Sequence, residues 1–213
     1  MEAMRSGVIL SGGSGSRLGT EKSLLPFCGR PLIQRIVKRL LYVVDEIVIV
    51  TRNDKQAEVL RELIPEAHFA CDCIKGYGPV AGLAIGMACA KGDYAFASGC
   101  DLPFLSVPVI DKLFELAVGY DAAVPIQPKG YMETLHSVYR REKMRDACER
   151  AIARGDRRIS APLSEMKLNL VPVEVLRPLD PELLTFFNVN TKDDLEAALK
   201  LCREDYSSSS FGS

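Results

Sequence analysis

The sequence has almost no net charge and no long apolar run. Its 27 Lys and Arg residues and 28 Asp and Glu residues balance to −1, so it lacks the broad basic surface typical of nucleic-acid binding. No segment approaches the ~18 consecutive apolar residues of a membrane helix, and Arg5 is followed by only four fairly apolar residues before the glycines, which is too short for a signal peptide. We therefore expect a cytoplasmic protein with neither a nucleic-acid nor a membrane partner.

Recognisable metal-binding and disulfide patterns are also missing. The chain has only two histidines, His68 and His136, and none of its seven cysteines forms a C-x-x-C pair, so zinc-ligand spacing does not assemble. Cys71 and Cys73 form a C-x-C pair to which the sequence assigns no role. The odd, scattered cysteines predict reduced thiols, mostly small core residues.

What remains is enough for one domain. With 213 residues, of which 47% are hydrophobic, the chain can bury the core of a single α/β unit. No repeat or linker divides it, so we expect one domain over residues 1–206. Residues 207–213 have little apolar content to bury, which predicts a disordered tail.

Residues 7–22 are the most informative stretch. A short apolar run, residues 7–10, reads as a buried strand and is followed by a loop with four glycines that carries Arg17 and Lys22. Glycine lets backbone N–H groups approach an anion closely, and Lys and Arg add positive charge, so the loop predicts a cradle for a nucleoside triphosphate. The dinucleotide fingerprint and the Walker A loop both fail on spacing. The alternative is a flexible surface loop.

Apolar patterning along the chain predicts alternating strands and helices. We expect strands at 7–10, 45–50, 67–71, 93–98, 121–126, 134–139 and 168–176. We expect helices at 31–41, 55–64, 79–90, 107–118, 142–154, 159–166 and 192–203. This order predicts a three-layer α/β/α sandwich with a mainly parallel sheet. Pro172 favours an edge position for the last strand.

The carboxyl ends of parallel strands form the usual ligand-binding edge of such a sheet. The loops after the first four strands should therefore bring the glycine loop, Asn53, Asp72 and Asp101 together. A carboxylate at Asp101 can hold Mg²⁺ against phosphate oxygens, and the alternative is a turn aspartate next to Pro103. His136 is expected in the core or at its rim, because no hydrolase triad accompanies it.

These residues carry a family resemblance. Residues 10–22, LSGGSGSRLGTEK, resemble the L-x-G-G-x-x-x-R-x-G-x-x-K signature of nucleotidyltransferases with a Rossmann-like, GT-A-like fold. Four further motifs resemble the molybdenum cofactor guanylyltransferase family: GPVAG at 78–82, CDLPF at 100–104, GDRR at 155–158 and FNVNT at 187–191. The resemblance implies transfer of GMP from GTP to the terminal phosphate of molybdopterin, with Mg²⁺ and release of pyrophosphate. It also implies transient contacts with cofactor-biosynthesis proteins or molybdoenzymes.

The same resemblance implies roles for individual residues. The nucleotide-binding candidates are Leu10, Ser11, Gly12, Gly13, Lys22, Thr51, Asn53, Asp72 and Asp101. Of these, 10–13 match the guanine segment, Asp72 the base or ribose side, and Asp101 the magnesium site. Thr51 stands where the family has asparagine, and Asn53 is the alternative. Arg17, Lys22 and Asp101 are the catalytic candidates, and the acceptor-binding candidates are Arg157, Arg158, Asn188 and Asn190.

The implied reaction needs no general base, because a phosphate nucleophile is already anionic at pH 7. This agrees with the absence of an obvious catalytic histidine. Other activities stay open from the sequence alone: a cytidylyltransferase for the same cofactor, a guanylyltransferase for cobinamide phosphate or a sugar phosphate, and a non-catalytic nucleotide-binding adaptor. The related cytidylyltransferases usually have Ala-Ala-Gly at positions 11–13, and the glycine at position 12 here leaves room for a purine.

Overall fold

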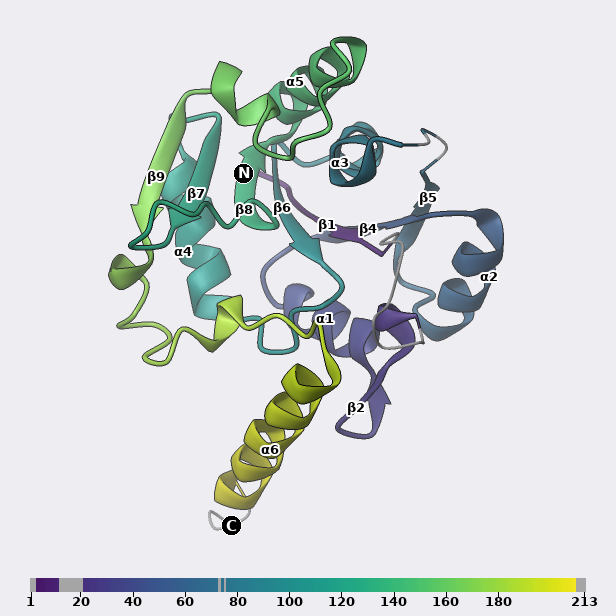
Figure 1. Ribbon diagram of the computed structural model, residues 1–213, viewed down its shortest axis with the longest axis vertical. Coiled ribbons are helices and arrows are strands. Elements are labelled where there is room, and N and C mark those ends of the chain that lie inside the picture. Colours follow the sequence, from purple (N-terminus) through teal and green to yellow (C-terminus); the bar gives the residue numbers. More distant parts are fainter. Residues whose placement is uncertain (1–2, 12–20, 73, 75, 210–213) are drawn as a thin grey trace.

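A computed structural model describes residues 3–11, 21–72, 74 and 76–209 (Figure 1). Its main sheet has seven strands in the order β5-β4-β1-β6-β8-β7-β9, and β8 alone among them runs antiparallel to its neighbours. The strands are β1 (Arg5–Leu10), β4 (Glu46–Thr51), β5 (His68–Cys71), β6 (Tyr94–Gly99), β7 (Ala122–Ile126), β8 (His136–Arg140) and β9 (Leu168–Pro172). The predicted fold class is confirmed, and β9 lies at the edge as Pro172 suggested.

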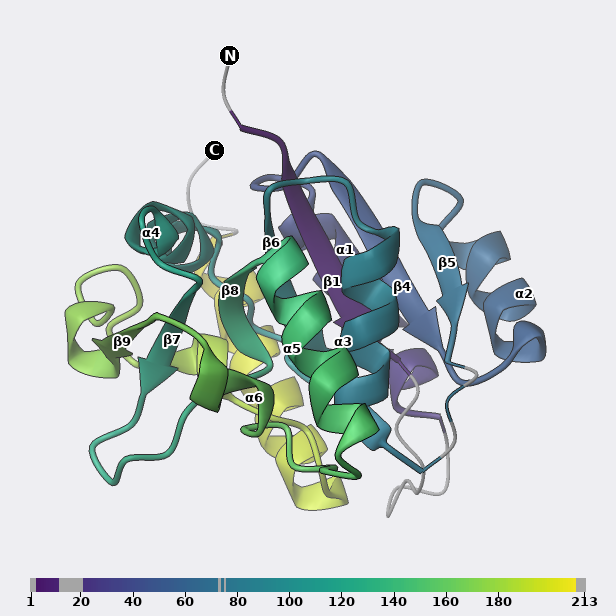
Figure 2. The same ribbon diagram turned by 90° about the horizontal axis from the view of Figure 1, so that it is seen from above.

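Helices cover both faces of the sheet (Figures 1 and 2). They are α1 (Leu32–Leu40), α2 (Asp54–Leu63), α3 (Gly78–Cys89), α4 (Val107–Ala117), α5 (Arg141–Ala153) and α6 (Lys192–Ser209). Alternate residues of a strand face opposite sides, so in β1 Val8 packs with α3 and α5 while Ile9 packs with α1 and α4. The two hydrophobic cores hold the three layers together and fix the edge at which the strands end.

Some local expectations were wrong. Residues 159–166 do not form an α-helix: only η2 (Pro162–Glu165), a 3₁₀ turn, is present, since Pro162 has no N–H to donate to a helical hydrogen bond. The last strand stops at Pro172 and is followed by η3 (Val173–Val175), another 3₁₀ turn. α6 continues to Ser209, three residues into the segment expected to be disordered, because extending a formed helix adds one hydrogen bond per residue.

The prediction that all cysteines are reduced is wrong for one pair. β2 (Pro26–Phe27) and β3 (Arg30–Pro31) form a hairpin whose two turn residues, Cys28 and Gly29, both have positive φ. This hairpin lies beside α6, and Cys28 is bonded to Cys202 with their Cα atoms 6.7 Å apart. The two cysteines are 174 positions apart in sequence, so only the fold brings them together. Within the described parts of the chain, no helix is long and apolar enough to cross a membrane.

Gly86 allows α3 to approach the sheet closely. A Cβ atom at this position would lie 2.4 Å from Cγ1 of the buried, branched Val8. Helix propensity alone predicts that Gly86→Ala stabilises the protein by about 1 kcal/mol. We expect the opposite, a loss of about 1–3 kcal/mol, because the overpacked core must shift. Urea unfolding of the wild type and of Gly86→Ala measures the sign of the change in the free energy of unfolding. A variant more stable than the wild type would contradict the close packing of α3 on the sheet.

His136 is a core residue, as expected. It is 1% exposed, its Nε2 lies 3.1 Å from Thr185 Oγ1, and its ring packs edge-on against Phe96 and Phe186. Burial lowers the pKa of His136 to about 3. In the unfolded chain the pKa of histidine is about 6.5, so the unfolded state takes up this proton first as the pH falls. The stability that depends on neutral His136 is therefore complete above pH 6.5 and is lost towards pH 3.

We expect His136→Asn to remove this part of the pH dependence. One proton contributes a slope of up to about 1.4 kcal/mol per pH unit to the free energy of unfolding. Between pH 6 and pH 4 the free energy of unfolding should therefore fall faster in the wild type than in the variant. The difference in this free energy between the two proteins should narrow. Urea unfolding at half-unit pH steps measures both slopes. Parallel slopes would show that His136 does not stay neutral in the folded protein.

Candidate active site

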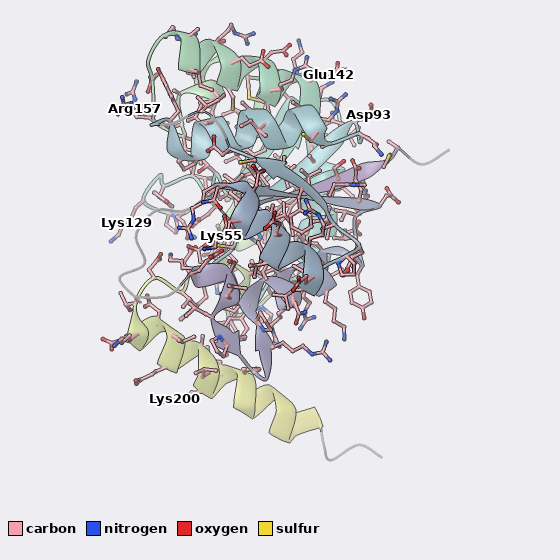
Figure 3. The ribbon with its side chains drawn as sticks, turned by 90° about the vertical axis from the view of Figure 1, so that its right-hand side faces the viewer. Lys55, Asp93, Lys129, Glu142, Arg157 and Lys200 are labelled. Carbon is pink, nitrogen blue, oxygen red and sulfur yellow. A yellow bond between two sulfur atoms is a disulfide. The ribbon has the colours of Figure 1, made fainter. Side chains whose placement is uncertain are left out.

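The first four parallel strands end at one edge of the sheet. In the registers of the pairs, Leu10 lies beside both Val50 and Gly99, and Thr51 lies beside Cys71. The residues that follow these strands therefore gather at this edge, as the sequence predicted. In Figure 3 this edge of the sheet lies on the left. Lys129 and Arg157 are at that edge, Lys55 lies toward it at the start of α2, and Asp93 and Glu142 lie at the opposite edge.

Lys22, Asp101 and Asn190 meet at the centre of this edge. The Lys22 ammonium lies 3.1 Å from Asp101 Oδ2 and donates to Asn190 Oδ1 at 2.7 Å. The backbone strengthens the arrangement, because Val189 N donates to the carbonyl of Asp101 at 2.8 Å. Three predicted site residues from distant parts of the sequence thus form one partly buried cluster. Asp101 Oδ1, which lies beside Gly99, accepts no hydrogen bond from the described residues.

A second network holds the start of the glycine loop and was not foreseen. Ser11 is buried, and its carbonyl and Oγ accept hydrogen bonds from Gln56 Nε2 at 3.0 and 3.2 Å. The same amide contacts Glu21, which also pairs with Arg52. Gln56 and Glu21 therefore tie both ends of the glycine loop to α2. The sequence offered one sign of this network: Gln56 is a polar residue at a position of α2 that faces the core.

Both candidates after the second strand have structural contacts. Thr51 is fully buried, and its hydroxyl lies 3.3 Å from the carbonyl of Ala70 in the neighbouring strand. Asn53 is the N-cap of α2, where its Oδ1 accepts from Gln56 N at 2.9 Å. Capping leaves the Asn53 amide N–H groups available at the exposed helix start, whereas the Thr51 hydroxyl faces the sheet interior.

Asp72 and the start of α3 form the far side of the edge. Asp72 Oδ1 accepts from Ile74 N at 3.0 Å, and burial raises the pKa of this carboxyl despite that bond. Arg157 reaches the same region, with its Cζ 5.6 Å from the ring centre of Tyr77 at the N-terminus of α3.

The two adjacent arginines therefore differ. Arg158 is 79% exposed and folds back on Asp156, with NH2 2.7 Å from Oδ2, while Arg157 lies over Tyr77. The hydrogen bonds from Arg158 lower the pKa of Asp156 to about 2. The structure thus brings Arg157 to the carboxyl edge of the sheet, beside the start of α3, whereas Arg158 forms a local ion pair.

The cluster contains no ready nucleophile. Burial, and then the charge of Asp101, raise the pKa of the Cys100 thiol to about 12, so this thiol stays protonated at neutral pH. His136 is enclosed in the core. Asn188 uses its amide nitrogen to bind the carbonyl of Phe186 at 3.0 Å, which leaves its amide oxygen available. The charges at this edge can bind and orient phosphates but do not attack them.

Three predicted residues, Gly12, Gly13 and Arg17, lie outside the described residues. Leu10 is described, and its side chain packs against α3, where a Cβ on Gly82 would lie 3.1 Å from Leu10 Cδ2. Outside those gaps, no group of three or more His, Cys, Asp or Glu residues could hold a metal. A magnesium ion bound with phosphate usually needs only one or two carboxylates, and Asp101 fits that requirement.

Comparison with known proteins decides the family. The family model of the MobA-like NTP transferase domain matches residues 7–168. The chain belongs to this family. Its relatives include the probable molybdenum cofactor guanylyltransferases of Methanosarcina mazei, 35% identical over 95% of this chain and 93% of that protein, and of Natronomonas pharaonis, 38% identical over 91% and 96%.

The crystal structure of a molybdopterin-guanine dinucleotide biosynthesis protein A from Archaeoglobus fulgidus is also similar to this MobA-like chain. It is 35% identical, has a TM-score of 0.82, and the match covers 93% of this chain and 99% of that one. The resemblance read from the five motifs is therefore confirmed at the level of the family and the fold. MobA-like NTP transferase domains are nucleotidyltransferase domains, so the edge described above is the candidate active site of such an enzyme.

Proposed function

We propose that this MobA-like protein transfers GMP from GTP to the terminal phosphate of molybdopterin and releases pyrophosphate. The observation that carries the proposal is the Lys22–Asp101–Asn190 cluster at the carboxyl edge of the sheet. The cluster offers a cation for phosphate oxygens, an aspartate with an oxygen that accepts no hydrogen bond from the part of the chain that the structure describes, and an amide. These groups suit a site that holds the triphosphate of GTP next to the phosphate of the acceptor. The relatives named for this activity match the chain over nearly its whole length.

The residues act by positioning and by electrostatic stabilisation. The acceptor phosphate is its own nucleophile, so the protein must align it with the α-phosphorus of GTP and stabilise the charge that passes to pyrophosphate. Lys22 neutralises phosphate oxygens, and Arg17 adds a second positive charge from the glycine loop. Asp101 would hold Mg²⁺, which when bound supplies further stabilisation of the phosphate charge. Residues 10–13, Asp72 and Asn53 or Thr51 bind the nucleoside.

The acceptor lies on the side of Asn188 and Asn190. Arg157 is the better candidate of the adjacent arginines for a phosphate, because Arg158 is already paired with Asp156. Since GTP is a cytoplasmic metabolite, we place the activity in the cytoplasm. Transient contacts with cofactor-biosynthesis proteins or molybdoenzymes would deliver the acceptor and receive the product.

The test is incubation of the protein with GTP, Mg²⁺ and molybdopterin, with assay of pyrophosphate. Release that requires all three components supports the proposal, and no release in the complete mixture contradicts it. Thermal unfolding with Mg²⁺ and GTP, CTP, ATP or UTP tests the base independently. A nucleotide at 100 times its dissociation constant adds about 2.7 kcal/mol of stability. Preference for CTP would indicate a cytidylyltransferase, and a shift with GTP without pyrophosphate release in the complete mixture would favour the nucleotide-binding adaptor.

A further inference from the structure

Glu133 is a carboxylate at the nucleotide edge to which the proposed function assigns no role. β8 is antiparallel to both β6 and β7, so β7 ends at the same edge as β6. The loop from Gln127 to Leu135 therefore lies at this edge, and Figure 3 shows its Lys129 on the same side as Arg157. A bridge between Ile126 and Met132 closes the tip of the loop.

The backbone of Glu133 is held firmly. Its N–H donates to the carbonyl of Pro125 at 2.9 Å. Its own carbonyl accepts from His136 N at 2.9 Å and from Ser137 Oγ at 2.7 Å. The position of this residue is thus tied to the ends of β7 and β8 rather than to the exposed tip of the loop.

The carboxylate is half-buried and only partly used. Gln127 Nε2 donates to Oε1 at 2.8 Å, and the other oxygen accepts no hydrogen bond from any residue that the structure describes. Burial raises the pKa of Glu133 more than this bond lowers it. A poorly solvated carboxylate with an open oxygen is prepared to accept hydrogen bonds from a ligand.

Contacts from the next residues place Glu133 on the acceptor side. His136, three positions later, contacts Thr185 and the ring of Phe186. From Phe186 the chain continues to Asn188 and Asn190, and Val189 bonds to Asp101. In the sheet, β8 and β6 are neighbours, and Ser11 and Asp72 follow strands on the other side of β6. Glu133 is thus separated from Ser11 and Asp72 by β6, the strand that Asp101 follows.

We propose that Glu133 recognises the amino-pyrimidinone edge of the pterin acceptor. This rests on the proposed function, which supplies a pterin phosphate as the acceptor. The edge presents two adjacent donors, the ring N3–H and the 2-amino group, and a carboxylate can accept from both at once. Guanine carries the same pair of donors, but the residues expected to bind guanine lie on the other side of β6. Glu133 is therefore a specificity residue that orients the acceptor while its phosphate lies near Lys22.

Fluorescence titration with free pterin and with lumazine, which has oxygen in place of the 2-amino group, tests the recognition without catalysis. The wild type should bind pterin about 10- to 100-fold more tightly than lumazine, as expected for charged hydrogen bonds. Glu133→Gln should lose most of this preference. Glu142→Gln, at the opposite edge of the molecule (Figure 3), is the matched control and should keep it. Equal preference in the wild type and Glu133→Gln would overturn the proposal.

Steady-state kinetics distinguish this proposal from the proposed function. In Glu133→Gln, KM for molybdopterin should rise about 10- to 100-fold, while the Kd for GTP and the thermal midpoint stay unchanged. A raised Kd for GTP with an unchanged acceptor KM would assign the carboxylate to guanine and overturn the proposal. If the wild type releases no pyrophosphate, the proposed function fails, and the pterin titration still tests Glu133 by itself.

Discussion

Asp101→Asn is expected to slow pyrophosphate release by about 10³-fold, the upper range for loss of one electrostatic contact to a transition state. The substitution removes the negative charge that would hold Mg²⁺ and leaves the size of the side chain unchanged. The Asp101 carbonyl still accepts the bond from Val189, so the local backbone should be retained. Turnover should fall far more than affinity for GTP, and the Mg²⁺ concentration for half-maximal activity should rise.

The same β-strand supplies a matched control. Asp93 is exposed directly before β6, whereas Asp101 follows its carboxyl end, and Figure 3 shows Asp93 at the edge away from the site. Asp93→Asn makes the same chemical change and should keep wild-type turnover. Pyrophosphate release by Asp101→Asn at the wild-type rate, over the same range of Mg²⁺, would exclude the metal role.

Lys22→Met should lower kcat/KM by about 10²- to 10³-fold. Methionine keeps an unbranched side chain but loses the charge that neutralises phosphate oxygens. If Lys22 acts on the phosphates, affinity for GTP should fall while affinity for guanosine, which has no phosphate, stays unchanged. Calorimetric titration with the two ligands makes this comparison.

Lys55→Met is the control for Lys22→Met. Lys55 is an exposed cation in the first turn of α2 on the same side of the molecule (Figure 3), and its replacement should leave both affinities near wild type. Lys22 also donates to Asn190, so its replacement removes a contact that helps to position this asparagine. Equal loss of guanosine and GTP affinity would show that Lys22 supports the site's shape rather than binding phosphate.

Much of the fold follows from local patterns. Apolar runs and helical stripes predicted every strand of the main sheet and all six α-helices, with ends that shift by a few residues. The two-residue strands β2 and β3 were missed because Cys28-Gly29 is an unusual pair for a tight hairpin. The segment 159–166 was assigned to a helix on its apolar residues, although Pro162 restricts it to a 3₁₀ turn.

For the candidate site, the sequence identified some residues but not their contacts. Lys22, Asp101 and Asn190 could be selected from motifs, because the chemistry of phosphate binding restricts the residue types. Their mutual contact could not be deduced, since it joins segments up to 168 positions apart. Gln56 and Glu133 were missed because neither belongs to a motif. Gln56 contacts Ser11 and Glu21, which are distant in the chain, and Glu133 is placed at the carboxyl edge of the sheet only by the pairing of β7 and β8.

The sequence by itself determined the three layers and the mainly parallel sheet, because these depend on periodicity. It also predicted residue types that suit phosphate, because glycine and positive charge lie close together in the chain. Only the tertiary structure decided which of two adjacent arginines faces the site, that Cys28 meets Cys202, and that the Thr51 hydroxyl is committed to the sheet. Each of these depends on the direction of a side chain relative to a distant segment, which local sequence does not specify.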